Sequence, residues 1–172
     1  MSSRIGRLPR FAVLALALTA AGCSSGTSPV TVTGAPTPTG SAATSCQRLL
    51  AALPDSLGKG LDRRKVSPAG ASAAGWGAAP VLLTCGETRT VPGYLPTSEV
   101  EEDLGVDWFL DKAGSAARWS TPTRQPQVIL VIPTSADPAT VVGGVTAAIC
   151  ANTRALVAPM LGPNGKPLPC GQ

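Results

Sequence analysis

The apolar residues along the chain predict a small domain in which helical and extended segments are mixed. Between Ser45, a capping residue, and Pro54, a helix breaker, the apolar side chains recur at helical spacing. The apolar face of this first helix consists of Cys46, Leu49, Leu50 and Leu53. Short apolar runs bounded by proline, glycine or serine predict four strands, at residues 80–85, 106–110, 117–120 and 128–132.

A second helix is predicted to begin at Asp137-Pro138, a cap followed by the proline preferred in the first turn. It continues to about residue 156, before Pro159, although Gly143 and Gly144 each weaken it by about 1 kcal/mol. Its helical spacing relates Val141, Val145, Ala148, Ile149 and Asn152. We therefore expect an α+β fold, a small and mainly antiparallel sheet of about four strands packed against two helices and tied by disulfides.

The first 22 residues have the layout of a cleavable export signal. Arg4, Arg7 and Arg10 precede an uncharged apolar run, Phe11 to Leu18, and small residues lead to Cys23. The run is too short to cross a membrane, which takes about 20 apolar residues. A cysteine directly after Ala-Gly resembles the lipobox of bacterial lipoproteins. The resemblance implies that Cys23 is acylated and that the protein is held at the outer face of the cytoplasmic membrane.

Residues 23–45 consist, after Cys23, mostly of Ser, Thr, Gly, Pro and Ala, without a charged side chain. Such a segment buries too little apolar surface to offset its conformational entropy, so we expect a disordered tether. Residues 46–172 are then expected to form one globular domain.

Composition removes several classes of function. Histidine, the commonest general base and zinc ligand, is absent from the sequence. From residue 46 onward 11 basic side chains face 10 acidic ones, a net charge of +1, which gives no electrostatic basis for binding nucleic acid. We expect no nucleic acid partner, no cofactor and no metal site.

Apart from Cys23 the sequence has four cysteines, and an even number in an exported chain predicts two disulfides. Three pairings are possible. We favour Cys46 with Cys85 and Cys150 with Cys170, because nearest partners close the smaller loops. Each bridge is expected to contribute about 3 to 4 kcal/mol. A zinc site is disfavoured because no two cysteines are closely spaced.

Ser56 and Lys59 match the serine, two spacers, lysine pattern of penicillin-interacting enzymes. The companion motifs of those enzymes are absent and the chain is far smaller than they are. We expect a solvated turn here.

An acidic cluster is a second candidate for chemistry, either glycoside cleavage or calcium binding. Glycoside cleavage needs two carboxyl groups about 5 to 10 Å apart, one of them with a pKa raised by burial. Closeness in sequence does not establish this, and an exposed charged face is the favoured interpretation. The cluster consists of Glu99, Glu101, Glu102, Asp103, Asp107 and Asp111.

Trp76, Trp108 and Trp119 carry most of the aromatic mass. Filling the core is the ordinary role of tryptophan in a chain with so few aromatic residues. If exposed, the three indoles would form a binding surface for a sugar or a partner protein.

A series of short motifs follows along the chain: Cys46 with Leu49 and Leu53-Pro54, Trp76-Gly77 with Pro80, residues 81–86, residues 105–109, and Arg124 leading into residues 128–133. In this order the motifs resemble an actinobacterial family of secreted or lipid-anchored proteins, the DUF 3515 family, labelled only as a domain of unknown function. The resemblance implies a location and a fold but no mechanism, and it implies a bridge between Cys46 and Cys85. Cys150 and Cys170 are not part of the family pattern.

The sequence therefore favours a non-enzymatic, lipid-anchored binding or scaffold module whose partner is an envelope protein or the cell wall. Two alternatives stay open. One is a cell-wall-active hydrolase that uses carboxylates of residues 99–111, and the other is a single-domain lipoprotein that carries a ligand.

Overall fold

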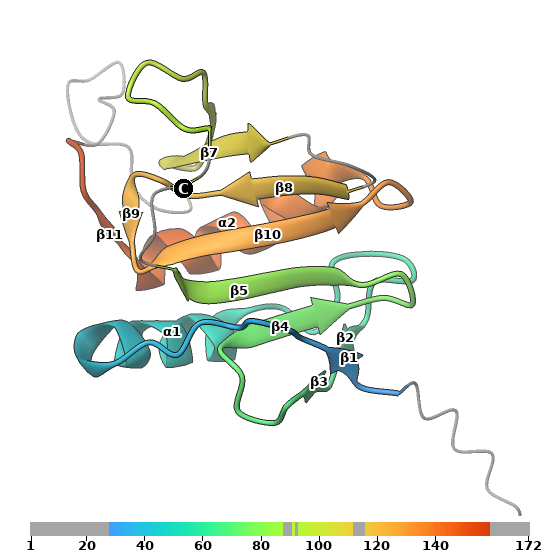
Figure 1. The fold of residues 1–172 in the computed structure, drawn as a ribbon. Coiled ribbons are helices and arrows are strands. Elements are labelled where there is room, and N and C mark those ends of the chain that lie inside the picture. Colours follow the sequence, from blue (N-terminus) through green and yellow to red (C-terminus); the bar gives the residue numbers. More distant parts are fainter. Residues whose placement is uncertain (1–27, 88–90, 92, 112–115, 159–172) are drawn as a thin grey trace, which may run out of the picture.

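The central feature of the fold is an antiparallel sheet with two helices on one face (Figure 1). The structure is a computed structural model that describes residues 28–87, 91, 93–111 and 116–158. The helices are α1 (Gly40–Ala52) and α2 (Pro138–Asn152). Across the sheet the strands follow the order β2 (Arg63–Arg64), β4 (Ala73–Trp76), β5 (Val81–Glu87), β10 (Gln127–Pro133), β8 (Ala116–Ser120), β7 (Val106–Asp111) and β6 (Glu101–Asp103).

The predicted α+β class with two helices and a mainly antiparallel sheet is confirmed, but the expected number of about four strands is wrong. Among the described residues the main sheet has seven strands. All four predicted segments are strands in the structure, namely β5, β7, β8 and β10. These are the apolar strands of the sheet. Together they form the centre of the sheet and most of one half of it.

Two of the strands that the sequence did not reveal have atypical compositions. Strand β4 is built largely of alanine and glycine, since Val30 packs closely over it and a Cβ at Gly75 would lie 3.1 Å from Val30 Cγ2. Strand β6 is entirely acidic. It lies at the edge of the sheet, where charged side chains keep the strand from pairing with other chains.

The expectation of a disordered tether up to residue 45 is wrong for residues 28–45. Strand β1 (Val30–Thr31) pairs in parallel with β3 (Val66–Ser67), and the Val30 and Val32 amides donate to Lys65 O and Ser67 O, each at 2.8 Å. Both valines are buried. Two large apolar side chains and a ladder partner are enough to order this proline-rich segment, which crosses in front of β4 in Figure 1. Residues 1–27, with the predicted signal and Cys23, lie outside the described residues.

Both helices differ from their predicted bounds at one end. Helix α1 begins at Gly40, six residues before the predicted first apolar position, Cys46, with Thr39 as its N-cap. Helix α2 begins after Asp137, as predicted, and Asp137 accepts a hydrogen bond from the Thr140 amide. It ends at Asn152 because the next residues form β11 (Arg154–Ala155), which pairs with β9 (Arg124–Gln125).

The core lies between the sheet and the helices. Alternate residues of β10 face the helices and are at most 1% exposed, and they pack with the apolar face of α2. The disulfide between Cys46 and Cys85 joins α1 to β5 inside this core, as predicted. Cys150 is also buried and has a bonding partner. Cys170 lies outside the described residues, so its pairing with Cys150 stays a prediction.

No helix among the described residues is both long enough and apolar enough to span a membrane.

Candidate binding groove

A groove separates the outer edge of the sheet from the first half of α2. It encloses about 500 Å³, within the range of about 300 to 1,000 Å³ usual for small-ligand sites. We call it the α2 groove. Its walls include Glu101 and Asp103 of β6 and Asp137 and Gly143 of α2 and its cap, and Trp108 and Trp119 of the sheet also line it.

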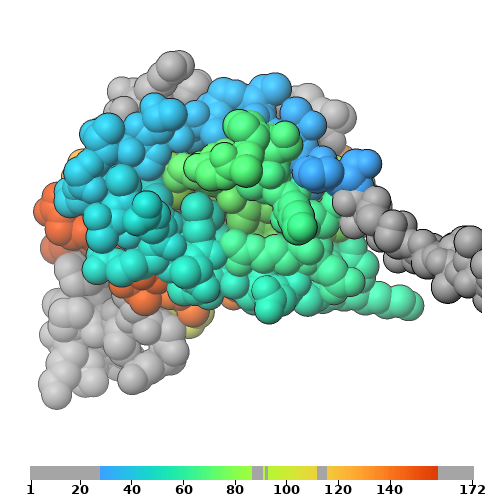
Figure 2. Space-filling view, turned by 90° about the horizontal axis from the view of Figure 1, so that it is seen from below, coloured from blue at the N-terminus to red at the C-terminus, as the bar shows by residue number. Residues whose placement is uncertain are grey.

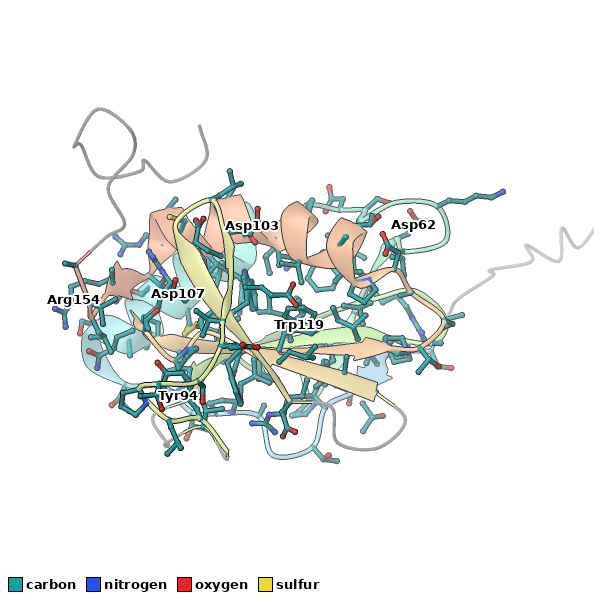
Figure 3. The ribbon with its side chains drawn as sticks, turned by 90° about the horizontal axis from the view of Figure 1, so that it is seen from above. Asp62, Tyr94, Asp103, Asp107, Trp119 and Arg154 are labelled. Atoms are coloured by element: carbon teal, nitrogen blue, oxygen red, sulfur yellow. A yellow bond between two sulfur atoms is a disulfide. The ribbon has the colours of Figure 1, made fainter. Side chains whose placement is uncertain are left out.

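Strand pairing brings the acidic residues of β6 to this groove. Glu101 is opposite Trp108 and Asp103 is opposite Val106, both of which are buried beneath the helices. Residues on paired positions of a sheet share one face, and residues two apart along a strand do too. Glu101 and Asp103 therefore lie on the helix side of the sheet edge. Figure 3 shows Asp103 at the border between the β6–β7 hairpin and α2, and Trp119 in the sheet below them.

The turn of the β6–β7 hairpin is fixed by the backbone and by two side chains. Leu104 and Gly105 both have positive φ values, 48° and 79°, as a two-residue hairpin turn of type I′ requires. Glu102 accepts a hydrogen bond from the Gly105 amide. Arg124 donates to the Gly105 carbonyl at 3.0 Å. These contacts hold the hairpin, and with it Asp103, in place beside α2.

Arg124 also binds the carboxyl-terminal end of α2. Its Nη2 donates to Cys150 O at 2.9 Å and to Thr153 O at 2.8 Å, and its Nε donates to Thr153 Oγ1 at 2.7 Å. Burial lowers the pKa of this guanidinium, and the negative charge of Asp107 partly offsets that effect. A cation at the carbonyl end of a helix is favoured by the helix dipole. Arg124 thus fixes the position of α2 relative to the hairpin across the groove.

The three tryptophans are buried, with 0, 0 and 5% of Trp76, Trp108 and Trp119 exposed. Their predicted core role is confirmed, and the alternative of an exposed three-indole surface is wrong. The indoles differ in hydrogen bonding. Trp76 Nε1 donates to Pro54 O at 3.0 Å, and Trp108 Nε1 donates to Thr146 Oγ1 at 3.3 Å. Trp119 Nε1 is buried without a hydrogen-bond partner among the described residues.

Asp103 Oδ2 is the second buried polar atom of the groove that has no partner among the residues described. Leaving a buried donor or acceptor unpaired costs about 1 to 3 kcal/mol, and more for a charged group. Such groups are rare in native proteins. Of the four unpaired buried side-chain atoms among the described residues, one donor and one acceptor thus belong to residues that line this groove, and the other two are Arg64 Nε and Arg118 Nε.

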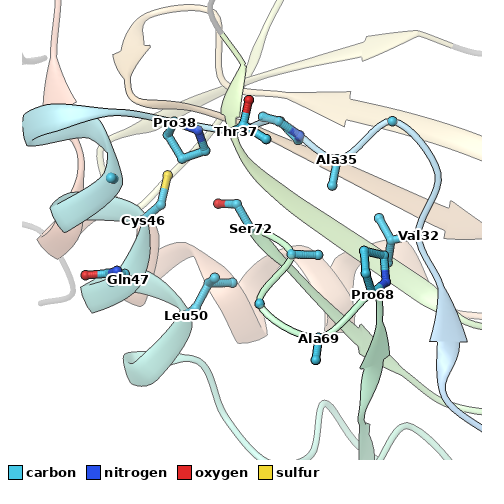
Figure 4. Close-up of a pocket in the computed structure, with 15 residues that line it drawn as sticks. Val32, Ala35, Thr37, Pro38, Cys46, Gln47, Leu50, Pro68, Ala69 and Ser72 are labelled. Carbon is cyan, nitrogen blue, oxygen red and sulfur yellow. The ribbon is translucent and has the colours of Figure 1, made fainter.

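A larger hollow lies at the opposite side of the molecule, between α1, the segment that follows β1 and the segment that precedes β4 (Figure 2). It encloses about 580 Å³, and Figure 4 shows Pro38, Cys46 and Ser72 along its wall. Its buried polar side chain, Ser72, donates to Cys85 O at 2.7 Å. Within the described ranges no unpaired buried polar atom lines this hollow, which makes it the weaker candidate.

The remaining candidates from the sequence are dispersed. The Ser56 hydroxyl donates to Gly58 O and accepts from Gly58 N, so it belongs to a turn, as expected. Asp107 accepts from Thr123 Oγ1 at 2.8 Å. Glu99, Asp107 and Asp111 do not line the α2 groove. The acidic cluster is thus divided, and only its members on β6 reach the site.

Sequence reasoning missed the roles of Arg124 and Gly143 at this site. Arg124 was noticed only within the family pattern, although a lone arginine among apolar strands is itself a signal of a buried network. Glu101 and Asp103 are two residues apart, so a strand places both side chains on the same face of the sheet. That spacing is another signal that the sequence offers.

The described residues define an α+β domain in which one antiparallel sheet carries both helices and an acidic groove opens beside the second helix. The chain belongs to the family described as protein of unknown function (DUF3515), whose family model matches residues 8–156. The family resemblance seen in the sequence is therefore confirmed. No curated protein and no solved structure matches the chain.

Proposed function

We propose that this protein is a non-enzymatic, lipid-anchored binding module of the cell envelope, with the α2 groove as its binding site. The observation that carries the proposal is the pair of unpaired buried atoms, Trp119 Nε1 and Asp103 Oδ2, in a groove of about 500 Å³. A bound molecule with one acceptor and one donor would satisfy both atoms. The proposed partner is an envelope component, either a protein or cell-wall material.

Membrane attachment rests on Cys23 and the export signal before it. Fractionation and fatty-acid labelling in an actinobacterial host test it. The wild-type chain is expected in the membrane fraction with label, and Cys23→Ser is expected to lose both. Retention and labelling of Cys23→Ser would contradict the anchor.

Binding in the groove is tested by native mass spectrometry of protein released from those membranes. Wild type should carry a ligand mass, and Gly143→Leu should not, because a side chain at Gly143 projects into open space beside the groove. Gly143→Ala, which adds one methyl group, is the matched control and should retain the ligand. Equal ligand masses on Gly143→Leu and wild type would place binding elsewhere.

A cell-wall-active hydrolase is the second candidate, and one observation favours it. Glu101 and Asp103 line the same groove, and most glycosidases use a pair of carboxylates. The sequence has no histidine to serve as a base, so the two carboxylates would have to act alone. Release of soluble sugars from cell walls by wild type, lost in Glu101→Gln and Asp103→Asn, would establish it. No release would remove it.

A further inference from the structure

The lining of the α2 groove has a charge of one sign. Four acidic residues line it, Glu101, Glu102, Asp103 and Asp137, and among the described residues no lysine or arginine does. The carboxylates of Glu102 and Asp137 already accept hydrogen bonds from backbone amides, those of Gly105 and Thr140. Glu101 and Asp103 remain. The potential in the groove therefore favours a cationic ligand and disfavours phosphates or acidic sugars.

The spacing of these carboxylates argues against a metal ion as that cation. Among the described residues no group of three or more Asp, Glu, Cys or His side chains is close enough to hold a metal. Calcium requires 6 to 8 oxygen ligands at about 2.3 to 2.6 Å. An organic cation needs fewer contacts and occupies more space.

The unpaired atoms specify which polar groups the ligand must carry. Asp103 Oδ2 offers one enclosed acceptor, which suits the compact charge of an ammonium group better than a guanidinium, which pairs with two oxygens at once. Trp119 Nε1 offers one donor and therefore requires an acceptor on the ligand. Trp108 and Trp119 add apolar side chains to the lining of the groove.

Resting on the binding function proposed above, we infer that the α2 groove recognises a ligand that carries both a primary ammonium group and a hydrogen-bond acceptor. The ammonium donates to Asp103, and a carbonyl or hydroxyl oxygen of the same ligand accepts from Trp119. A lysine-like side chain of a peptide and an amino sugar share this chemistry.

Calorimetric titration of the purified protein with two matched pairs of probes tests the inference and separates the two sources. The first pair is Nα-acetyl-lysine methylamide and its uncharged analogue, Nα-acetyl-norleucine methylamide. The second is glucosamine and N-acetylglucosamine. At least one ammonium probe is expected to bind ten or more times more tightly than its uncharged partner. The pair that shows the difference identifies the source of the ammonium.

Two variants assign the binding to the groove. Asp103→Asn should weaken the ammonium probe about tenfold or more, the loss expected for a hydrogen bond to a charged group. It should not lower the melting temperature, because it removes an unpaired buried charge. Gly143→Leu should abolish binding while the helix stays folded, since leucine favours helix more than glycine does.

Equal binding of charged and uncharged probes, an unchanged affinity in Asp103→Asn, or no binding of any probe would overturn the inference. The proposed function would survive this result if wild type still carried an uncharged ligand mass that Gly143→Leu lacks. It would fail only if the native protein carried no ligand in the groove.

Discussion

We call the half of the domain that contains α1 the closed half, because its buried indole has a hydrogen-bond partner, and the half that contains α2 the open half, because Trp119 has none among the described residues. Beneath α1, Trp76 donates to Pro54 O, and Arg63 lies over its ring at 5.6 Å. Arg63 also donates to Leu50 O and Leu53 O, the carbonyls at the end of α1. Beneath α2, Arg124 makes the equivalent contacts at the helix end.

The halves differ in whether the buried polar groups beneath each helix have hydrogen-bond partners. In the α1 half the disulfide Cys46–Cys85 fastens the helix to the sheet, and the indole has its partner. In the α2 half Trp119 and Asp103 keep unpaired atoms beside a groove. The same helix-on-sheet packing thus pairs its buried polar groups on one side and leaves two of them without a partner among the described residues on the other.

The largest expected effect comes from opening the closed half. Replacing both Cys46 and Cys85 with alanine should lower the free energy of unfolding by about 4 kcal/mol, because the bridge closes a loop of 39 residues in the unfolded chain. Urea denaturation measures the loss. A loss below 1 kcal/mol would show that packing alone holds α1. The affinity of the double variant for an ammonium probe should equal that of wild type.

Exchanging tryptophan for phenylalanine in each half compares the two directly. Trp76→Phe should destabilise by about 2 to 3 kcal/mol, since it leaves Pro54 O unpaired as well as a cavity. Trp119→Phe should cost about 1 kcal/mol less than Trp76→Phe, because no hydrogen bond to the described residues is lost. Thermal and urea unfolding of the two variants give the comparison. An equal or larger cost at Trp119 would contradict the difference between the halves.

Two neighbouring glycines of α2 sharpen the comparison further. Gly143→Ala should stabilise by about 1 kcal/mol through helix propensity, since its Cβ meets nothing within 4 Å. Gly144→Ala should gain less or lose stability, because its Cβ would lie 2.8 Å from Leu57 Cδ2 and force that side chain to move. Melting temperatures of the pair measure the difference. Identical shifts would mean that α2 does not pack against Leu57 as described.

The smallest effect concerns the cap of α2. Hydrogen bonds from the Thr140 side chain and backbone lower the pKa of Asp137 below its ordinary value of 3.8. A lowered pKa in the folded state means that the contribution to stability is full above the ordinary pKa and is lost as the pH falls through the lowered one. Denaturation from pH 6 down to pH 2 should therefore show a decline that is shallower in Asp137→Asn. An identical pH profile in both proteins would contradict the role of this carboxylate.

The sequence predicted the central strands of the sheet, in both halves, better than the strands toward its edges. Apolar runs identify β5 and β10, and nearest-neighbour cysteines identified the bridge between Cys46 and Cys85, because burial and loop closure act on patterns visible in one dimension. Residues 28–45 were misjudged since two buried valines, not overall composition, order that segment. The acidic strand β6 was read as a charged face, and its pairing with β7 cannot be seen in composition.

The site was only partly predictable for the same reason. Trp108, Trp119 and Asp103 were singled out as residues, but their convergence depends on how β6 and α2 approach each other across the sheet edge. Hydrogen-bond saturation is also invisible in a sequence: three tryptophans look alike until the partner of each indole is known.

The indole N–H resonances of the three tryptophans test the central claim most directly. Each gives one signal in a nitrogen–proton correlation spectrum, and the Trp→Phe variants assign them. During titration with the ammonium probe that binds more tightly, the Trp119 signal should shift in wild type and stay in place in Asp103→Asn, while Trp76 does not respond in either. A shift of Trp76 with a stationary Trp119 would place recognition in the α1 half and contradict the account.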